Sequence, residues 1–396
     1  MSRAEELLRG VVHCESREHL VERLERNEKL RIKFGIDPSA PDLHLGHTVP
    51  MRLLRRWQRE GHLPVLVIGD FTARIGDPSG RSITRPQLSP EAVEANARTY
   101  LDQLFTVVDA DHVEIRRQSE WYRDFDLVAV LRLADTATVA QLLQRADFEQ
   151  RMRLEQPVGV PELFYPLLQG YDSVAVRADV ELGGNDQLFN LLRGRAVQVA
   201  YGRPPQDIVT VPLLEGLDGE RKMSKSLGNA VAVAACADQQ FGQLMSLPDQ
   251  LITRYLDLLT DIPDEELQRT ERELRTGTLN PRDAKAAMAE RLVSEFHGQG
   301  QAAAAREEFF RVHRDRALPA QIADVAIDAR QFWDARELLI AAGMAGSKSE
   351  AARLIQGGAV ELAGDRVGDW RQPLVVHPGA VLRVGSRRVV RLAPGP

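Results

Sequence analysis

The sequence has little cysteine and no long apolar run. Its 396 residues include two cysteines, Cys14 and Cys236, which excludes a disulfide framework and any Cys-Cys metal site. The longest apolar stretches, such as residues 63–68 and 230–237, fall far short of the ~18 residues that a membrane-spanning helix needs. The first 20 residues carry charges throughout and no apolar core of a secretory signal, so a cytoplasmic chain is expected.

Charge is spread unevenly over the chain. Residues 331–396 contain nine Lys or Arg and six Asp or Glu, a net charge of +3, whereas the preceding 330 residues carry −9. A basic end on an acidic body suits a nucleic-acid contact made through that end. Random variation over so short a segment could produce the same difference, so the charge alone does not decide the question.

The length predicts two or three domains, and the first part of the chain has the pattern of an open α/β fold. Residues 31–36 alternate as a strand, residues 45–60 have the apolar spacing of a helix that Gly61 closes, and residues 63–68 form a continuous apolar run. This βαβ unit indicates a parallel sheet that is buried on both faces.

Two more strands are predicted at residues 179–182 and 208–214, and Asn185 is expected to cap the helix between them. Residues 121–166 have helical spacing and form a predicted insertion, either a surface hairpin or a subunit contact. The predicted domains are an α/β domain over residues 1–235, an all-helical domain over residues 236–330 with residues 324–329 as a connector, and a small α+β module over residues 331–396.

The segment from Pro41 to His47 opens the predicted helix and carries the first candidate chemistry. His44 and His47 are three residues apart, on one helix face, beside the unpaired N–H groups and the positive end of the helix dipole. This arrangement suits a polyphosphate, and Gly46 leaves room for a base or a ribose against the backbone. Taken alone, the pair could equally be two ordinary surface histidines.

The second candidate is more specific. Residues 217–229 include Lys222-Met223-Ser224-Lys225-Ser226 between glycines, on a predicted loop that follows a strand. A mobile pair of lysines can stabilise the charge that builds on a leaving pyrophosphate without a covalent step. A chance basic loop would rarely reproduce these five residues downstream of the two histidines.

Both segments match the two signature motifs of class I aminoacyl-tRNA synthetases, and the whole chain most closely resembles the tyrosyl-tRNA synthetases of bacteria. The resemblance implies a Rossmann-type catalytic domain, a helical anticodon-side domain and an RNA-binding module. It also implies a homodimer formed through the helical insertion. The further matching segments are Gly69-Asp70-Phe71, Gly76-Asp77-Pro78-Ser79-Gly80-Arg81, residues 165–172 and residues 183–187.

A candidate amino-acid pocket can be argued from spacing. Tyr165, Gln169 and Asp172 stand at positions i, i+4 and i+7, so a helix would present a phenol, an amide and a carboxylate on one face. On a surface helix this would be an ordinary polar stripe. The segment is otherwise apolar, so an inward-facing row is favoured.

The resemblance assigns roles to these and other residues. The tyrosine ammonium would be held by Asp77, Tyr165 and Gln169, the phenolic hydroxyl by Asp172, and the carboxylate would lie near Gln187. The ATP side would be formed by Gly35, Asp37, His44, Gly46, His47, Gly184, Asp186, Lys222 and Lys225. Of these residues, His44, His47, Lys222 and Lys225 would be catalytic.

The chain departs from the family at two places. Many members place a tyrosine at the position of Lys33, as a second partner of the substrate hydroxyl, and a small residue at the position of Phe34, so Asp172 is expected to carry most of the hydroxyl recognition. Residues 76–81 lack the spacing of a phosphate-binding P-loop, and Arg81 and Arg85 could either contact phosphate or be solvated. No metal-ligand pattern occurs, so Mg²⁺ is expected only as part of the ATP substrate complex.

The tail resembles a small RNA-binding module first seen in a ribosomal protein. Lys348 and Arg353 fall on a short predicted helix before a hairpin, where contacts with the phosphates of folded RNA are plausible. The alternative is a basic capping module with no ligand.

The predicted activity is ATP-dependent activation of tyrosine to tyrosyl-adenylate and pyrophosphate, followed by transfer of tyrosine to the terminal adenosine of tRNA(Tyr). The alternatives are a tryptophanyl-tRNA synthetase, a non-catalytic RNA-binding relative and a small-metabolite nucleotidyltransferase. The row that contains Asp172 and the RNA-binding tail disfavour the tryptophan enzyme, because an indole offers no hydroxyl group and that enzyme usually lacks the tail. The intact motifs disfavour the second alternative, and the additional domains disfavour the third.

Overall fold

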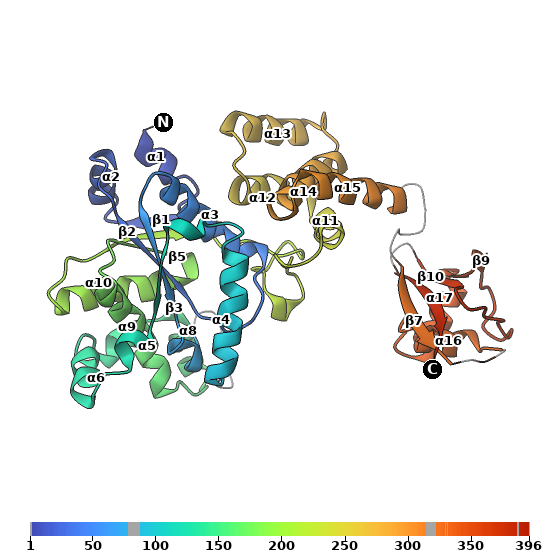
Figure 1. Cartoon of the computed structure of the whole chain (residues 1–396), viewed down its shortest axis with the longest axis horizontal. Coiled ribbons are helices and arrows are strands. Elements are labelled where there is room, and N and C mark those ends of the chain that lie inside the picture. The colour runs from blue at the N-terminus through green and yellow to red at the C-terminus, as the bar shows by residue number, and fades with distance from the viewer. Residues whose placement is uncertain are drawn as a thin grey trace. The chain divides into compact units, whose positions relative to one another are not determined.

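The protein is described by a computed structural model, whose contacts divide the chain into two compact units, residues 1–298 and 299–396 (Figure 1). This division does not coincide with the boundaries predicted near residues 235 and 330, and the three-domain scheme stays a prediction. The structure describes residues 2–77, 88–313, 322–328, 330, 332–385 and 388–395.

The first unit is built on a six-stranded sheet of order β1-β6-β5-β2-β3-β4, in which β1 is antiparallel to β6 and the other neighbours are parallel. Every residue of β6, and all of β3 after its first, is buried, so helices cover both faces of the sheet as predicted. The strands are β1 (His13–Glu15), β2 (Arg31–Ile36), β3 (Leu63–Ile68), β4 (Glu114–Arg117), β5 (Val180–Gly184) and β6 (Asp207–Val211).

Helix α3 connects β2 to β3 and starts at the predicted residue, Leu45. It ends at Arg59, and Gly61 follows with a φ of +81°, a conformation that favours glycine. Helices α9 and α10 pack on each other, and α10 also contacts β5 and β6. The other helices around this sheet are α1 (Arg3–Leu7), α2 (Arg17–Glu25), α4 (Pro90–Leu104), α5 (Ser119–Tyr122), α6 (Leu127–Ala134), α7 (Val139–Leu142), α8 (Ala146–Arg153), α9 (Val160–Ala175) and α10 (Leu188–Ala200).

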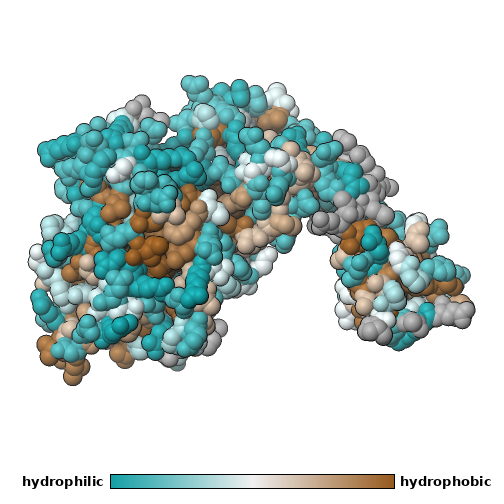
Figure 2. Space-filling view, viewed as in Figure 1, coloured by the Kyte–Doolittle hydropathy of each residue, from teal (hydrophilic) through white to brown (hydrophobic). Residues whose placement is uncertain are grey.

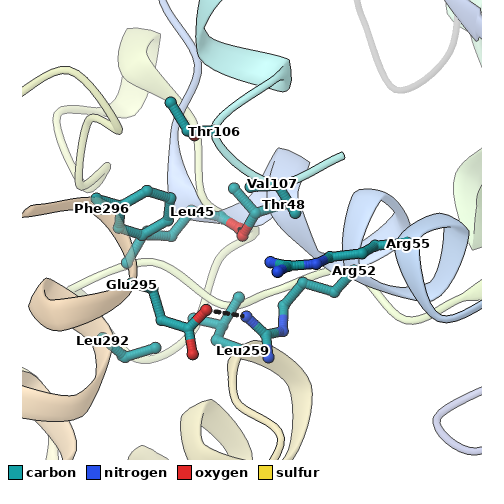
Figure 3. A pocket seen from close by; sticks show the side chains of 10 residues that line it. All are labelled: Leu45, Thr48, Arg52, Arg55, Thr106, Val107, Leu259, Leu292, Glu295 and Phe296. Atoms are coloured by element: carbon teal, nitrogen blue, oxygen red, sulfur yellow. Dashed lines mark hydrogen bonds and ion pairs between the residues drawn. The ribbon is translucent and has the colours of Figure 1, made fainter. Parts of the chain in front are cut away.

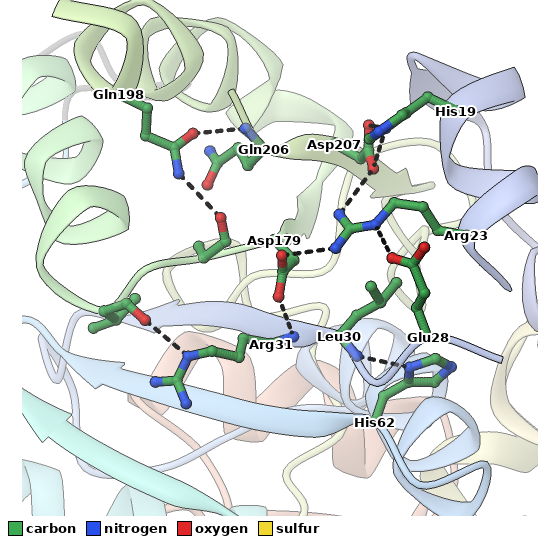
Figure 4. A network of polar contacts seen from close by, with 12 residues as sticks. His19, Arg23, Glu28, Leu30, Arg31, His62, Asp179, Gln198, Gln206 and Asp207 are labelled. Atoms are coloured by element: carbon green, nitrogen blue, oxygen red, sulfur yellow. Dashed lines mark hydrogen bonds and ion pairs between the residues drawn. The ribbon is translucent and has the colours of Figure 1, made fainter. Parts of the chain in front are cut away.

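A polar network fastens the amino ends of three strands (Figure 4). The Arg23 guanidinium lies 2.8 Å from Asp179, just before β5, and 3.9 Å from Asp207, the first residue of β6. The Asp179 carboxylate also accepts a 2.9 Å hydrogen bond from the backbone N–H of Arg31, where β2 begins. The ion pairs and hydrogen bonds at the amino ends of the strands hold the sheet together. The predicted motifs lie at the opposite ends, the carboxyl ends of the strands.

The expectation that Asn185 caps the next helix is wrong. Asn185–Gln187 forms a 3₁₀ turn, η3, and α10 starts only at Leu188 with no side-chain cap. The Asn185 side chain instead accepts a 3.0 Å hydrogen bond from Thr210 Oγ1 on β6. A tertiary partner therefore replaces the local cap that the sequence suggested.

A helical region follows the sheet, and the predicted helices near residues 283–296 and 301–312 are present. Helix α14 packs on α11 and α12. The helices are α11 (Ala237–Met245), α12 (Ile252–Leu259), α13 (Asp264–Thr276), α14 (Pro281–His297) and, in the second unit, α15 (Gln299–His313).

The second unit contains a five-stranded sheet of order β7-β11-β10-β8-β9 with its own core, which includes Trp333, Leu338, Leu339 and Leu382. The expected connector at residues 324–329 is corrected here, because β7 pairs in parallel with β11. The elements are β7 (Ala323–Ile327), α16 (Ala335–Ala341), α17 (Lys348–Gln356), β8 (Val360–Leu362), β9 (Asp365–Arg366), β10 (Val381–Val384) and β11 (Arg388–Pro394).

Candidate active site

The candidate site lies at the carboxyl ends of β2 and β5, where open α/β sheets bind ligands. Gly35 and Asp37 stand at the end of β2, and Gly184 ends β5 with Asp186 two residues later. A Cβ atom built on Gly35 would meet nothing within 4 Å. The backbone there faces open space, as a ligand position requires.

His44 immediately precedes α3, and its ring lies against that of His47, with the two centroids 3.8 Å apart. The backbone N–H of His44 donates a 3.1 Å hydrogen bond to His47 Nδ1. Burial, above all, lowers the pKa of His44 to about 2 and that of His47 to about 4, and Lys225 lowers both further. Both imidazoles are therefore neutral at pH 7, and Nε2 of His47 carries its proton.

Backbone pairing joins the histidine segment to residues 231–233, which follow the lysine loop. Leu45 N–H donates to Val231 O at 3.0 Å, and Val233 N–H donates to Leu43 O at 2.9 Å. Gly46 lies in the same contact, since a Cβ there would be 3.0 Å from His44 Nδ1 and 3.6 Å from Met223 Cβ. The start of α3 thus holds the segment that follows the lysine loop.

Both loop lysines reach carboxylates from other parts of the sheet domain. Lys222 Nζ lies 3.1 Å from Asp186, after β5, and Lys225 Nζ lies 2.5 Å from Asp42, just before α3. All four side chains are partly exposed. Lys222 therefore lies at the carboxyl end of β5 and Lys225 at the amino end of α3. This is the place that the sequence predicted for phosphate.

Asp37 connects the predicted ATP side to the predicted tyrosine side. Its carboxylate accepts a 2.6 Å hydrogen bond from the Tyr165 hydroxyl of α9 and a 2.7 Å bond from Thr72 Oγ1. A Cβ on Gly69 would come within 2.0 Å of Asp37 Oδ1. Glycine at position 69 therefore makes room for this carboxylate.

Asp172 of α9 is buried, with 2% of its surface exposed. Its carboxylate accepts hydrogen bonds from Gln118 Nε2 at 2.7 Å, Trp121 Nε1 at 3.1 Å and Tyr122 OH at 3.2 Å. Burial raises the pKa of Asp172 to about 7, against the opposing effects of Lys33 and of the hydrogen bonds. The group thus titrates near neutral pH.

Gln169 and Lys33 belong to one buried cluster. Gln169 Nε2 donates to Glu181 Oε1 at 3.1 Å, and Lys33 pairs with the same carboxylate at 2.9 Å. Phe34, the second departure from the family, is buried. The lysine that occupies the usual tyrosine position is therefore held by Glu181.

Asp77 and Gln187 also meet, as Gln187 Nε2 donates to Asp77 Oδ2 at 2.6 Å. Arg145, which is 5% exposed, lies 3.4 Å from the same aspartate. Arg81 and Arg85 lie outside the described residues. Thus the predicted tyrosine residues and the predicted ATP residues converge on one region of the first unit.

Sequence reasoning missed several members of this region. Gln118 links the two sides, because its Oε1 accepts from Thr72 and its Nε2 donates to Asp172. Glu181 and Tyr122 were also missed. The sequence contained a signal only for Glu181, which is a charged residue within an otherwise apolar strand.

Lys348 and Arg353 lie on α17 of the second unit, and both are exposed. Lys348 Nζ pairs with Glu337 at 2.7 Å.

A pocket lies between α3, the residues after α4, α12 and α14 (Figure 3), and Arg52 pairs across it with Glu295 at 3.0 Å. None of the predicted site residues lines it, so it is separate from the site at the carboxyl ends of the strands. Its lining residues are Leu45, Thr48, Arg52, Arg55, Thr106, Val107, Leu259, Leu292, Glu295 and Phe296.

The described part of the chain contains no group of three or more His, Cys, Asp and Glu side chains that could hold a metal ion. Within the same residues, no helix has both the length and the apolar character to cross a membrane.

The first unit combines a Rossmann-type sheet, paired imidazoles at the start of a helix and a loop with two lysines. This fold and this site are those of the class I synthetases, which transfer a nucleotidyl group. The family described as class I tRNA synthetases (W and Y) matches residues 25–314. The chain belongs to this family.

Two bacterial relatives are similar to this chain over almost its whole length. The tyrosine–tRNA ligase of Thermotoga maritima is 46% identical over 98% of this chain and 96% of its own length, and that of Dehalococcoides mccartyi is 46% identical over 96% of each. The fold is similar to that of a mitochondrial tyrosyl-tRNA synthetase from Aspergillus nidulans, with a TM-score of 0.66, 23% identity, and coverage of 80% and 95% of the two chains. It is also similar to that of the tryptophanyl-tRNA synthetase of Plasmodium falciparum, with a TM-score of 0.60, 14% identity, and coverage of 77% and 87%.

Proposed function

We propose that this protein is a tyrosine–tRNA ligase. The tyrosine carboxylate attacks the α-phosphate of ATP, pyrophosphate leaves, and the held tyrosyl-adenylate passes its tyrosine to the terminal ribose of tRNA(Tyr). Mg²⁺ enters with ATP as part of the substrate complex. No side chain forms a covalent bond, so catalysis rests on positioning and on electrostatic stabilisation of the leaving pyrophosphate.

One observation carries the catalytic part of the proposal. The backbone pairing of residues 43–45 with residues 231–233, together with the lysine contacts to Asp42 and Asp186, brings the histidine and lysine motifs to one place. We assign to Lys222 and Lys225 the stabilisation of the negative charge that develops on the phosphates.

The histidines act differently from the lysines. Neutral His47 donates through Nε2, because its Nδ1 is occupied by the His44 backbone N–H. His44 Nδ1 is buried and has no hydrogen-bond partner among the residues that the structure describes. We propose that both rings serve as uncharged hydrogen-bonding groups toward ATP.

Amino-acid choice rests on Asp172, which sits in a nest of hydrogen-bond donors and would accept the substrate hydroxyl. We place the substrate ammonium at Asp77, Tyr165 and Gln169. A tryptophan substrate would offer this carboxylate an indole N–H in place of the hydroxyl, as Trp121 does, so the preference for tyrosine is also supported by the relatives, which are tyrosine–tRNA ligases. Amino-acid-dependent ATP–pyrophosphate exchange over all twenty amino acids tests the proposal, and exchange with tryptophan alone would overturn it.

The helical insertion supports a homodimer. Leu127, Val128 and Leu131 of α6 are 73%, 72% and 59% exposed, and Figure 2 shows an apolar end of the first unit where Figure 1 places α6. An apolar patch of this kind is typical of a protein contact. Light scattering of Leu131→Asp against the wild type tests this part of the proposal.

The 331–396 module of the second unit would bind tRNA, with Lys348 and Arg353 on its phosphates. The helical residues 236–330, which belong partly to each unit, would serve the anticodon side. The support is the net charge of +3 on residues 331–396 and the exposure of both side chains.

A further inference from the structure

Lys33 and Glu181 face each other on neighbouring parallel strands in the middle of the first sheet. They are register partners of β2 and β5, they are 0% and 1% exposed, and their charged groups lie 2.9 Å apart. Burying two charges costs more than their attraction returns unless further hydrogen bonds satisfy both groups. A buried pair therefore requires an explanation beyond stability.

The cluster meets that condition fully. The Lys33 ammonium donates to Glu181, to the backbone O of Gln169 at 2.6 Å and to Ser173 Oγ at 2.8 Å, which uses all three of its protons. Glu181 also accepts from Gln206 Nε2. Space for that bond depends on Gly194, where a Cβ would lie 2.7 Å from Gln206 Nε2 and 3.2 Å from Glu181 Oε2.

The cluster fixes one amide that matters to the substrate. An ionised carboxylate can only accept hydrogen bonds, so Gln169 must turn Nε2 toward Glu181, at 3.1 Å. Its Oε1 is then the end left over, and among the described residues none donates to that oxygen. An ammonium group needs an acceptor, and the reverse orientation of the amide would offer it a donor.

We propose that Glu181 and Lys33 are positioning residues for the amino-acid substrate: Glu181 holds the Gln169 amide with Oε1 available to the substrate ammonium, and Lys33 holds Glu181. This inference rests on the proposed function, which places the ammonium at Gln169. It adds two residues that touch no substrate and act through the amide.

The test exchanges the carboxylate and the amide between positions 181 and 169. In Glu181→Gln the partner can donate as well as accept, so Gln169 loses its fixed orientation. In Gln169→Glu two carboxylates face each other. In the double variant Glu181→Gln/Gln169→Glu, the new amide donates to the new carboxylate, whose second oxygen still accepts from the ammonium, and Lys33 still has a neighbouring negative charge.

We expect each single variant to raise the tyrosine KM in pyrophosphate exchange about tenfold or more, the effect of losing a hydrogen bond to a charged group. The ATP KM should change little, and the double variant should return the tyrosine KM to within about threefold of wild type. A double variant no better than the worse single variant, or a normal tyrosine KM in Glu181→Gln, would overturn the positioning role.

Gln198→Glu is the matched control, because it also places a carboxylate at a buried glutamine, one that bonds Ala178 O and the backbone of Gln206 instead of the substrate residues. It should lower the melting temperature without a selective rise in tyrosine KM. If the wild type activates another amino acid, the proposed function fails. The same comparison made with that amino acid still decides the positioning role, because every amino acid carries the ammonium.

Discussion

The Tyr165 hydroxyl donates a 2.6 Å hydrogen bond to Asp37 Oδ2, across 128 positions of sequence. One residue is proposed for the tyrosine ammonium and the other for ATP, so the two substrate sites share a hydrogen bond. Thr72 Oγ1, which donates to the same aspartate at 2.7 Å, strengthens the connection. The two sites should therefore respond together when this bond is lost.

Replacing Tyr165 by Phe should raise the KM values of tyrosine and ATP together, each about tenfold, because a hydrogen bond to a carboxylate is removed from both sites. Steady-state pyrophosphate exchange with each substrate varied in turn measures the effect. Tyr201→Phe is the control, as its ring packs on Tyr171 away from Asp37. A change confined to the tyrosine KM would show that Asp37 does not serve ATP.

Gly46→Ala should reduce kcat strongly and leave the fold intact. The new methyl group would lie 3.0 Å from His44 Nδ1 and 3.1 Å from Cε1, so the imidazole has to move from its position. Gly242→Ala in α11 is the matched control, because a Cβ there meets nothing within 4 Å and alanine favours a helix by about 1 kcal/mol. Single-turnover adenylate formation by both variants decides it, and an unimpaired Gly46→Ala would remove His44 from catalysis.

Lys222→Ala and Lys225→Ala should each slow adenylate formation by roughly 10²-fold or more, the usual effect of losing one preorganised electrostatic group. Tyrosine affinity should barely change. Stability should also change little, because the pairs with Asp186 and Asp42 are partly exposed and such pairs contribute about 0–1 kcal/mol. Rapid-quench kinetics, calorimetric tyrosine binding and thermal unfolding separate these effects. Lost tyrosine binding with a normal rate would contradict the assignment.

Asp172 should make tyrosine binding depend on pH near neutrality. Its pKa is raised to about 7 by burial, and the ionised form is the better acceptor of the substrate hydroxyl, so tyrosine affinity should rise as pH increases through 7. Between pH 3.8, the ordinary pKa of an aspartate, and pH 7, Asp172 is protonated in the folded state but ionised in the unfolded state. The stability that this proton contributes is therefore lost as pH rises from 3.8 to about 7. Asp172→Asn should flatten the pH dependence of both tyrosine affinity and stability, measured by calorimetric binding and thermal unfolding.

Asp172→Ala should abolish tyrosine activation in pyrophosphate exchange. Undiminished exchange in Asp172→Ala would exclude it from the pocket.

Arg353→Ala should raise the KM for tRNA and make its salt dependence shallower by about one counterion, with pyrophosphate exchange unchanged. Lys348→Ala should act more weakly, because Lys348 is already paired with Glu337 at 2.7 Å. Arg336→Ala is the control, since its guanidinium stacks on Trp370 at 3.7 Å from the ring centroid. Aminoacylation at two salt concentrations gives the comparison, and an unchanged tRNA KM in Arg353→Ala would mean that α17 does not bind RNA.

Local signals predicted much of the sheet. β2 and β3 have their predicted bounds because alternation and a continuous apolar run reflect burial directly. The row Tyr165, Gln169 and Asp172 was visible because one helix, α9, carries all three.

The features that sequence reasoning missed depend on partners far along the chain. Gln118 reaches Asp172 from 54 positions away, and no spacing rule marks such a pair. The strand β7 looked like a connector because its pairing partner, β11, begins more than 60 residues later. Propensity is a weak guide wherever a tertiary contact completes the element.

The strand order of the second sheet has a consequence for synthesis on the ribosome. β11 lies between β7 and β10, so the strand that is translated last occupies an interior position. Until residues 388–394 emerge, β7 and β10 each lack a neighbour, whereas the first unit has all its strands by residue 211. The nascent chain should therefore acquire a folded adenylate-forming unit well before its carboxyl-terminal sheet can close, and loss of the last strand would expose two unpaired edges.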